Sequence, residues 1–160
     1  LLDEAEFLAL RSGNDYDHLD ILSALSEAWA TFGDWDSLRQ WGIQGLVDGQ
    51  RHSAFYPAFT LLATWIEMLF ATGQEKGAGF FLEEARLMVA QAPRVKRRDL
   101  IVYHHAEWMM GRGEAHRHEA RALLDAELAM RGNQGWTFLG LRTFRAIEES
   151  LAKGQPGVYN

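Results

Sequence analysis

The sequence contains no cysteine and only three prolines in 160 residues. Without cysteine the chain has no disulfide framework, no thiolate metal site and no thiol nucleophile. No apolar run approaches the roughly 18 uncharged residues that a membrane-spanning helix needs. The composition, 48% hydrophobic and 24% charged, excludes a disordered or collagen-like chain. We therefore expect one cytoplasmic globular domain with a sizeable core.

Motifs for common catalytic chemistries are also missing. The sequence has no nucleophile elbow, phosphate loop or dinucleotide fingerprint. The glycine pair at 77–79 lies at an expected helix start, but it lacks the preceding strand of a phosphate cradle. We expect a protein that is not an enzyme and that holds no cofactor and no metal.

Positive charge is scarce in the first part of the chain. Residues 1–93 carry 5 Lys and Arg against 14 Asp and Glu, whereas residues 94–160 carry 11 against 8. The basic run at 94–98 joins the two parts and could attract phosphates. We interpret this run as a solvated loop, and the acidic remainder argues against nucleic-acid binding.

What the sequence does contain is a repeat. A glutamate is followed six residues later by a glycine three times, with 40 residues between copies: Glu27/Gly33, Glu67/Gly73 and Glu107/Gly113. Self-similarity at a fixed period of about 20–50 residues is typical of stacked repeat architectures.

Apolar residues at three- and four-residue spacing predict a helix over almost every segment. No segment alternates with a period of two, so we expect no strands. Glycine should end the first helix of each pair, and Asp34 should start a second helix. Gly42 and Gly45 share a packing stripe, which indicates close approach of a neighbouring helix, because glycine inside a helix costs roughly 1 kcal/mol against alanine. The third pair should have a longer turn, since its apolar stripe lags the repeat by two residues. The expected helices cover 1–10, 18–32, 37–47, 54–72, 77–90, 98–110, 114–130 and 136–152.

These helices define a single helical-repeat domain. An isolated pair cannot bury its apolar stripe, so stacking must supply the core. The segment 1–15 reads as a second helix whose partner is missing, which indicates a fragment of a larger protein and makes self-association of the fragment plausible. The expected units are 1–15, repeats over 18–53, 54–93 and 94–133, a terminal helix over 134–153 and a tail over 154–160.

Two stretches carry a family resemblance. Trp29…Gly33-Asp34-Trp35…Gly45 and Leu69…Gly73-Gln74…Ala85 resemble tetratricopeptide-like repeats, with glycine and small residue 12 apart. The period of 40 and stretches such as GQEKGAGFFLEEARLMV are similar to repeat regions of large bacterial signalling proteins. These are the predicted ATPases fused to nucleotide cyclases and the transcription activators related to the maltose-regulon activator.

This resemblance implies an all-α fold, a right-handed superhelical stack of antiparallel helix hairpins. It also implies a regulatory domain in signalling or transcription, which binds a partner protein, a peptide or a small inducer. In such stacks the first helix of each unit lines the concave surface. By register the expected partner-binding residues are Glu27, Ala30, Glu67, Phe70, Tyr103, His104, Glu107 and Met110.

The three glutamates would then form a column of carboxylates about 10 Å apart, the usual helix-packing distance. Such a groove would favour a cationic or amide-rich peptide with an apolar anchor, or a small basic ligand. We expect Glu67→Lys to weaken partner binding and to leave melting nearly unchanged. A periodic exposed glutamate can also simply keep a face soluble, and the sequence leaves this alternative open.

A different class of site remains open around Tyr103, His104 and Glu107. A histidine and a glutamate at three-residue spacing could share a metal, in a small-molecule or metal-dependent hydrolytic site. His116 and His118 could add a ligand if folding brought the helices together. The HEXXH motif is absent, and polar surface histidines are the alternative interpretation.

Overall fold

The computed structural model describes residues 15–51, 54–91, 94–131 and 141–154. These parts are helical and contain no strand, which confirms the all-α class. The expected helix over 1–10 and the end of the tail lie outside the described residues. The elements are α2 (Asp15–Phe32), α3 (Trp35–Arg51), α4 (Phe55–Ala71), the 3-10 turn η1 (Glu75–Gly77), α5 (Ala78–Gln91), α6 (Arg97–Met109), α7 (Glu114–Arg131) and α8 (Leu141–Lys153).

The first two hairpins turn through glycines in the left-handed backbone region, as predicted. Gly33 has a φ of 71° and Gly73 a φ of 69°. After each glycine the next amide donates to the carbonyl five residues earlier, at 2.9 Å in the first hairpin and 2.8 Å in the second. These bonds satisfy carbonyls that a helix end leaves open. Asp34 then caps α3, because its carboxylate accepts from the amide of Ser37 at 3.2 Å and from its hydroxyl at 2.8 Å.

The third hairpin departs from the repeat. Gly111, with a φ of 74°, ends α6, and the next amide, that of Arg112, donates to the Glu107 carbonyl at 3.0 Å. Gly113 instead lies directly before α7, with a φ of 117°. The pairing of Glu107 with Gly113 as helix end was therefore wrong by two residues. The longer turn that the apolar register predicted is present.

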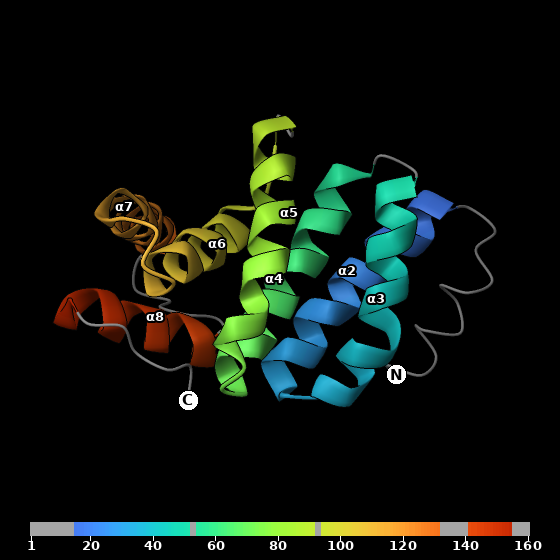
Figure 1. Cartoon of the computed structure of the whole chain (residues 1–160), viewed down its shortest axis with the longest axis horizontal. Helices are drawn as coiled ribbons and strands as arrows, with labels where there is room; N and C mark the ends of the chain where they lie inside the picture. The colour runs from blue at the N-terminus through green and yellow to red at the C-terminus, as the bar shows by residue number, and fades with distance from the viewer. Residues whose placement is uncertain (1–14, 52–53, 92–93, 132–140, 155–160) are drawn as a thin grey trace.

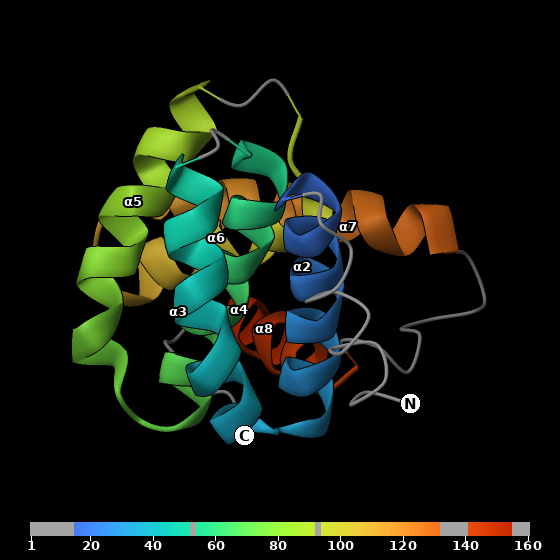
Figure 2. The ribbon, with the colours of Figure 1, turned by 90° about the vertical axis from the view of Figure 1, so that its right-hand side faces the viewer.

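Three hairpins follow one another along the long axis, α2/α3, then α4/α5, then α6/α7 (Figure 1). The first helices pack in sequence, α2 on α4 and α4 on α6, while α3 packs on both α2 and α4. The third hairpin is turned relative to the others, so that α7 is viewed nearly end-on in Figure 1. The last helix, α8, lies behind α2 and α4 in Figure 2 and contacts α7 and α2.

The core is centred on α4. Every residue from Pro57 to Phe70 is buried, because α4 is covered by α2, α3, α5 and α6. A helix that is apolar on nearly all sides belongs in the interior. Three of its residues, Thr60, Thr64 and Glu67, are polar exceptions. None of the described helices combines the length and the apolar character that crossing a bilayer requires.

Three glycines let α3 approach α4 closely, which confirms the expectation for Gly42 and Gly45. A Cβ atom on Gly42 would lie 2.4 Å from Trp65 Nε1, and one on Gly45 would lie 2.8 Å from Leu61 Cδ1. A Cβ atom on Gly49 would lie 2.8 Å from the Cβ of Ala58. The contact at Gly49 is the least forgiving, because the short alanine side chain cannot move aside without its backbone.

We expect Gly49→Ala to lower the free energy of unfolding by about 1–3 kcal/mol, because overpacking outweighs the gain in helix propensity. The matched control is Gly79→Ala on α5, where the nearest atom is Arg112 Nη2 at 3.9 Å. That change should stabilise by up to about 1 kcal/mol. Urea unfolding followed by circular dichroism measures both, and equal effects of the two changes would contradict the close α3–α4 packing.

Candidate functional site

Buried polar side chains gather on one kind of helix. Among the described residues they all lie on α2, α4, α6 and α8, and the second helices α3, α5 and α7 contribute none. A buried polar group is costly unless it finds a partner, so hydrophobic burial alone does not explain this inner face. Its members are Ser23, Ser26, Thr60, Thr64, Glu67, Asp99, His105, Glu107, Thr143 and Ser150.

Each glutamate of the 40-residue repeat meets a cation. Lys96 Nζ lies 2.6 Å from Glu27 Oε1, and Arg98 Nη2 lies 3.2 Å from Glu67 Oε2. For the third, Glu107, the Nε of Arg112 lies 3.2 Å from Oε2. This contact is an ion pair, but its geometry is not that of a hydrogen bond. The column of carboxylates is therefore a column of ion pairs.

The expected exposure of this column is wrong for two of its members. Glu67 and Glu107 are each only 1% exposed, whereas the Glu27 side chain keeps 20%. Of the other residues predicted to line the groove, Ala30, Phe70 and Tyr103 are buried, and His104 and Met110 are half-buried. The physical reason is packing: adjacent first helices and α8 cover the face that was expected to be open. Whether these residues bind a partner stays a prediction.

The basic run at 94–98 is not simply a solvated loop, as the sequence suggested. Lys96 and Arg98 reach inward to the glutamates, and Arg97 Nη1 pairs with Glu127 Oε2 on α7 at 3.1 Å. Only Arg94 in this run is exposed. The run occupies the start of α6, so its cations bind α6 to α2, α4 and α7.

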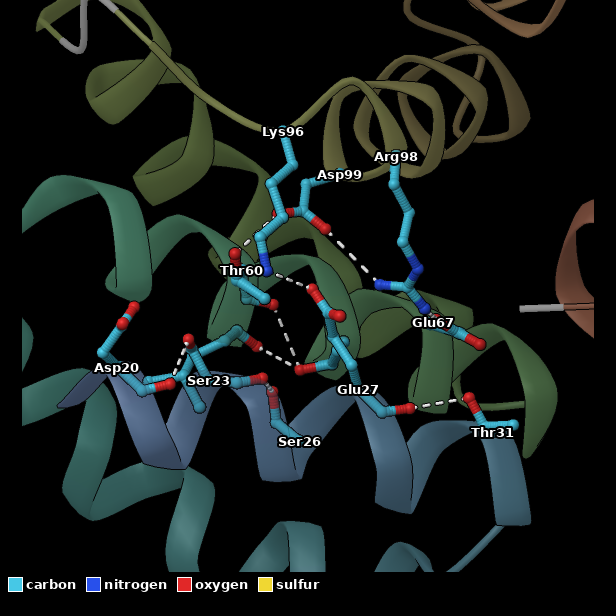
Figure 3. A network of polar contacts seen from close by, with 12 residues as sticks. Asp20, Ser23, Ser26, Glu27, Thr31, Thr60, Glu67, Lys96, Arg98 and Asp99 are labelled. Atoms are coloured by element: carbon cyan, nitrogen blue, oxygen red, sulfur yellow. Dashed lines mark hydrogen bonds and ion pairs between the residues drawn. The ribbon is translucent and has the colours of Figure 1, made fainter. Parts of the chain in front are cut away.

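Arg98 and Asp99 form the centre of the network (Figure 3). Asp99 is fully buried and accepts a hydrogen bond from Thr60 Oγ1 at 2.7 Å. Its other oxygen, Oδ1, lies 3.4 Å from Arg98 Nη1. The guanidinium carbon of Arg98 lies 5.5 Å from the centroid of the Phe144 ring on α8. One arginine therefore contacts α4, α6 and α8.

The network holds more negative than positive charge. Its carboxylates are Glu27, Glu67 and Asp99, and its cations are Lys96 and Arg98. Burial would lower the pKa of both cations, but the glutamates outweigh it and raise both values. Burial raises the pKa of Asp99 to about 6, and the charge of Glu27 adds to this rise, although Arg98 and the Thr60 hydroxyl oppose it.

One side of helix α8 packs on this inner face. Phe144, Ile147 and Leu151 are buried, whereas Arg145 and Glu149 on its other side are exposed. Three polar contacts accompany the apolar ones. The Thr143 hydroxyl donates to Glu67 Oε1, Ser150 Oγ lies 3.0 Å from His105 Nε2, and Arg117 Nη2 donates to the Leu151 carbonyl at 3.2 Å.

The alternative site around Tyr103, His104 and Glu107 is divided by the fold. Burial, followed by the charge of Glu107 and a hydrogen bond to it, raises the pKa of Tyr103 to about 12. The His104 ring contacts the edge of Tyr103, but its Nδ1 lies 3.0 Å from His116 Nδ1 on α7. In the described part of the chain no three His, Asp or Glu side chains converge on a possible metal position. The shared His–Glu metal site is therefore not assembled here.

Sequence reasoning missed several members of the network: Thr60, Asp99, Thr143 and Phe144. A signal existed for two of them. Thr60 interrupts the most apolar helix of the chain, and Asp99 directly precedes the apolar segment Leu100–Tyr103. Polar residues inside apolar helices are candidates for buried hydrogen bonds. Nothing local marked Thr143 or Phe144, since their partners lie far away in the sequence.

We expect Asp99→Asn to make the stability of the protein less sensitive to pH between 4 and 7.5. The folded pKa of Asp99 lies above its unfolded value near 4, so its stabilising effect is full below about pH 4 and is lost as the pH rises through 6. Asparagine cannot ionise. Between pH 4 and pH 7.5, the free energy of unfolding of the variant should rise relative to that of the wild type by on the order of 2 kcal/mol. Urea unfolding across that range measures this difference.

Two histidines provide the internal check on this pH profile. Burial lowers the pKa of His105 to about 4, and burial followed by the charge of His116 lowers that of His104 to about 4. Their contribution to stability is present above about pH 6.5 and is lost as the pH falls through 4. Because both proteins contain these histidines, the effect cancels in the difference. A difference that stays constant with pH would contradict the assignment of Asp99.

The burial of Glu67 reverses the expected effect of Glu67→Lys on melting. A lysine would place an ammonium group beside the Arg98 guanidinium and leave both charges buried, so we expect a loss of about 3–5 kcal/mol. Glu149→Lys is the control, because the Glu149 side chain is 70% exposed and its pair with Lys153 at 3.5 Å is solvated. Thermal unfolding separates the two: equal melting temperatures would show that Glu67 is accessible after all.

No family model, no curated protein and no solved structure matches this chain. Its function is therefore inferred from the chain's own residues, of which the inner-face network and the seat of α8 are the most distinctive.

Proposed function

We propose that this chain is a non-catalytic interaction module whose inner face binds an amphipathic helix of a protein partner. The observation that carries the proposal is the seat of α8, in which a 13-residue helix lies on that face through one side only. Helix-in-groove recognition uses anchors at i, i+3, i+4 and i+7. The buried positions 144, 147 and 151 of α8 follow this spacing.

The polar contacts suggest what kind of helix the face prefers. Phe144 packs under the Arg98 guanidinium, where a cation and an aromatic face attract one another. Directly beside it, the Thr143 hydroxyl donates to Glu67. One turn of helix beyond Ile147, Ser150 meets His105. A partner helix with a hydroxyl–aromatic pair and a second hydroxyl seven residues later would reproduce all three contacts.

Charge balance makes an exchange of helices feasible. Glu67 keeps its ion pair with Arg98 whether or not α8 is present, because both residues belong to the stack itself. Removing α8 therefore leaves no buried carboxylate without a cation, which would cost several kcal/mol. What is lost is the burial of three apolar side chains, the contact of Phe144 with Arg98 and three hydrogen bonds, one of them to the Glu67 carboxylate. A partner helix of the same pattern would restore these contacts.

Several features support a tetratricopeptide-like, right-handed superhelical stack as the scaffold. The hairpins α2/α3 and α4/α5 turn through the same glycine geometry 40 residues apart, and the first helices pack in sequence. With the sequence resemblance, this makes regulation in the cytoplasm, by capture of a partner protein, the role that we propose. In a signalling or transcription regulator, exchange of α8 would report partner binding to the rest of the protein.

A peptide of residues 141–153 tests the proposal as a stand-in for the partner helix. In the wild-type chain α8 blocks the face, so we expect weak binding. In the full chain with Phe144→Ala and Ile147→Ala, α8 is loosened and the labelled wild-type peptide should bind at least tenfold more tightly. Fluorescence anisotropy measures the affinity, and circular dichroism checks that the variant chain is folded.

Two controls sharpen this measurement. Arg145→Ala changes an exposed residue of α8 and should leave peptide binding as weak as in the wild type. A peptide with Thr143→Ala and Phe144→Ala should bind the loosened chain at least tenfold less tightly than the wild-type peptide. If the loosened chain unfolds, or binds both peptides equally, α8 is a fixed part of the fold and the proposal fails.

A further inference from the structure

The α6/α7 hairpin brings two histidines together outside the charge network. His104 on α6 and His116 on α7 have their Nδ1 atoms 3.0 Å apart, with ring centroids separated by 5.2 Å and ring planes inclined by 36°. Tyr103 packs edge-on against both rings, at 4.9 Å from His104 and 6.1 Å from His116. Both histidines are half-buried, so water reaches the pair.

A nitrogen–nitrogen contact of this length needs one proton between the two atoms, since two lone pairs or two N–H groups facing each other would repel. The two nitrogens therefore share a single proton, and an imidazole nitrogen that has given up its proton is a metal ligand.

We propose that His104 and His116 bind one divalent transition-metal ion through their two Nδ1 atoms, with water completing the coordination. The shared proton does not need to leave the protein, because the donating ring can move it to Nε2 through solvent. Both Nδ1 lone pairs point to the ion once the two rings have rotated from their hydrogen-bonded orientation. Glu119, three residues after His116 on the same helix, supplies nearby negative charge.

The two nitrogens are close enough to share one ion. With bonds of about 2.0–2.1 Å, two ligands at a right angle lie about 2.9 Å apart, and two at the tetrahedral angle lie about 3.4 Å apart. The 3.0 Å between the hydrogen-bonded nitrogens falls within this range. Imidazole suits Ni²⁺, Cu²⁺ and Zn²⁺, and Cu²⁺ has the highest affinity among these divalent ions. The site should therefore bind Cu²⁺ most tightly.

Such a site would join the two helices of the third hairpin, α6 and α7. An ion held by both helices would stabilise the hairpin that carries Arg98 and Asp99 at the other end of α6. This inference does not depend on the proposed function. The polar and ring contacts of His104 and His116 are with each other and with Tyr103, and none of these residues lies on α8. A partner helix and a metal ion would bind at separate places.

Titration of the tag-free full chain with NiCl₂ at pH 7.5, followed by isothermal calorimetry, tests the site. We expect one ion per chain, and at least a tenfold loss of affinity in His104→Gln and in His116→Gln. His118→Gln is the matched control, because His118 is exposed on the same helix and should leave the affinity unchanged. Cu²⁺ should bind more tightly than Ni²⁺ and Zn²⁺ in the same experiment.

Electron paramagnetic resonance of the Cu²⁺-loaded chain counts the nitrogen atoms bound to the ion. A loss of folding alone would not change this count from two to one. Two coordinated nitrogens are expected in the wild type and in His118→Gln, and one in either pair variant. Circular dichroism verifies that each variant is folded. If His104→Gln does not fold, His104→Asn takes its place. The proposal is overturned if no ion binds at millimolar concentration, or if the pair variants bind as tightly as the wild type.

Discussion

The pairing of Arg98 with Glu67 is the interaction on which the rest of the inner face depends. Glu67 is buried in the most enclosed helix of the fold, and an unpaired carboxylate there would cost several kcal/mol. Arg98 neutralises it from a position 31 residues later in the chain, while also touching Asp99 and the ring of Phe144. The start of α6 must therefore lie where it can reach both α4 and α8, and this requirement fixes how the third hairpin and the last helix meet the first two.

A polar inner face gives the fold specificity more than stability. An apolar interface between first helices would tolerate sliding, whereas an ion pair and a hydroxyl–carboxylate bond are satisfied in one register only. The same chemistry makes the face selective toward a helix laid upon it, because hydroxyl and aromatic groups must fall at defined positions. The raised pKa of Asp99 couples this register to pH. Burial is its main cause, and the neighbouring carboxylate of Glu27 adds to it.

The sequence predicted the helices well, and the residue-level reasons are visible in the structure. Three- and four-residue spacing of apolar side chains placed α2 to α7 to within a few residues, and the glycines and Asp34 act at helix ends as expected. The third glutamate–glycine pair misled, since Gly111 rather than Gly113 ends α6. Seven of the eight residues expected to line a groove lie on the first helices, and Met110 directly follows the end of α6. Their exposure was misjudged, because periodicity identifies a face without saying what covers it.

Local physics explains this division. Helix formation, glycine turns and capping depend on neighbours within about five positions, so the sequence by itself determined the all-α class, the hairpins and the close contact at Gly42 and Gly45. The state of a glutamate depends on water and on cations that only packing brings near. Lys96 is 69 residues from Glu27, and Thr143 is 76 residues from Glu67. Only the tertiary structure decided that the repeated glutamates are ion-paired, that α8 contacts Glu67, and that His104 faces His116. The reason is that charge and burial act through space and not along the chain.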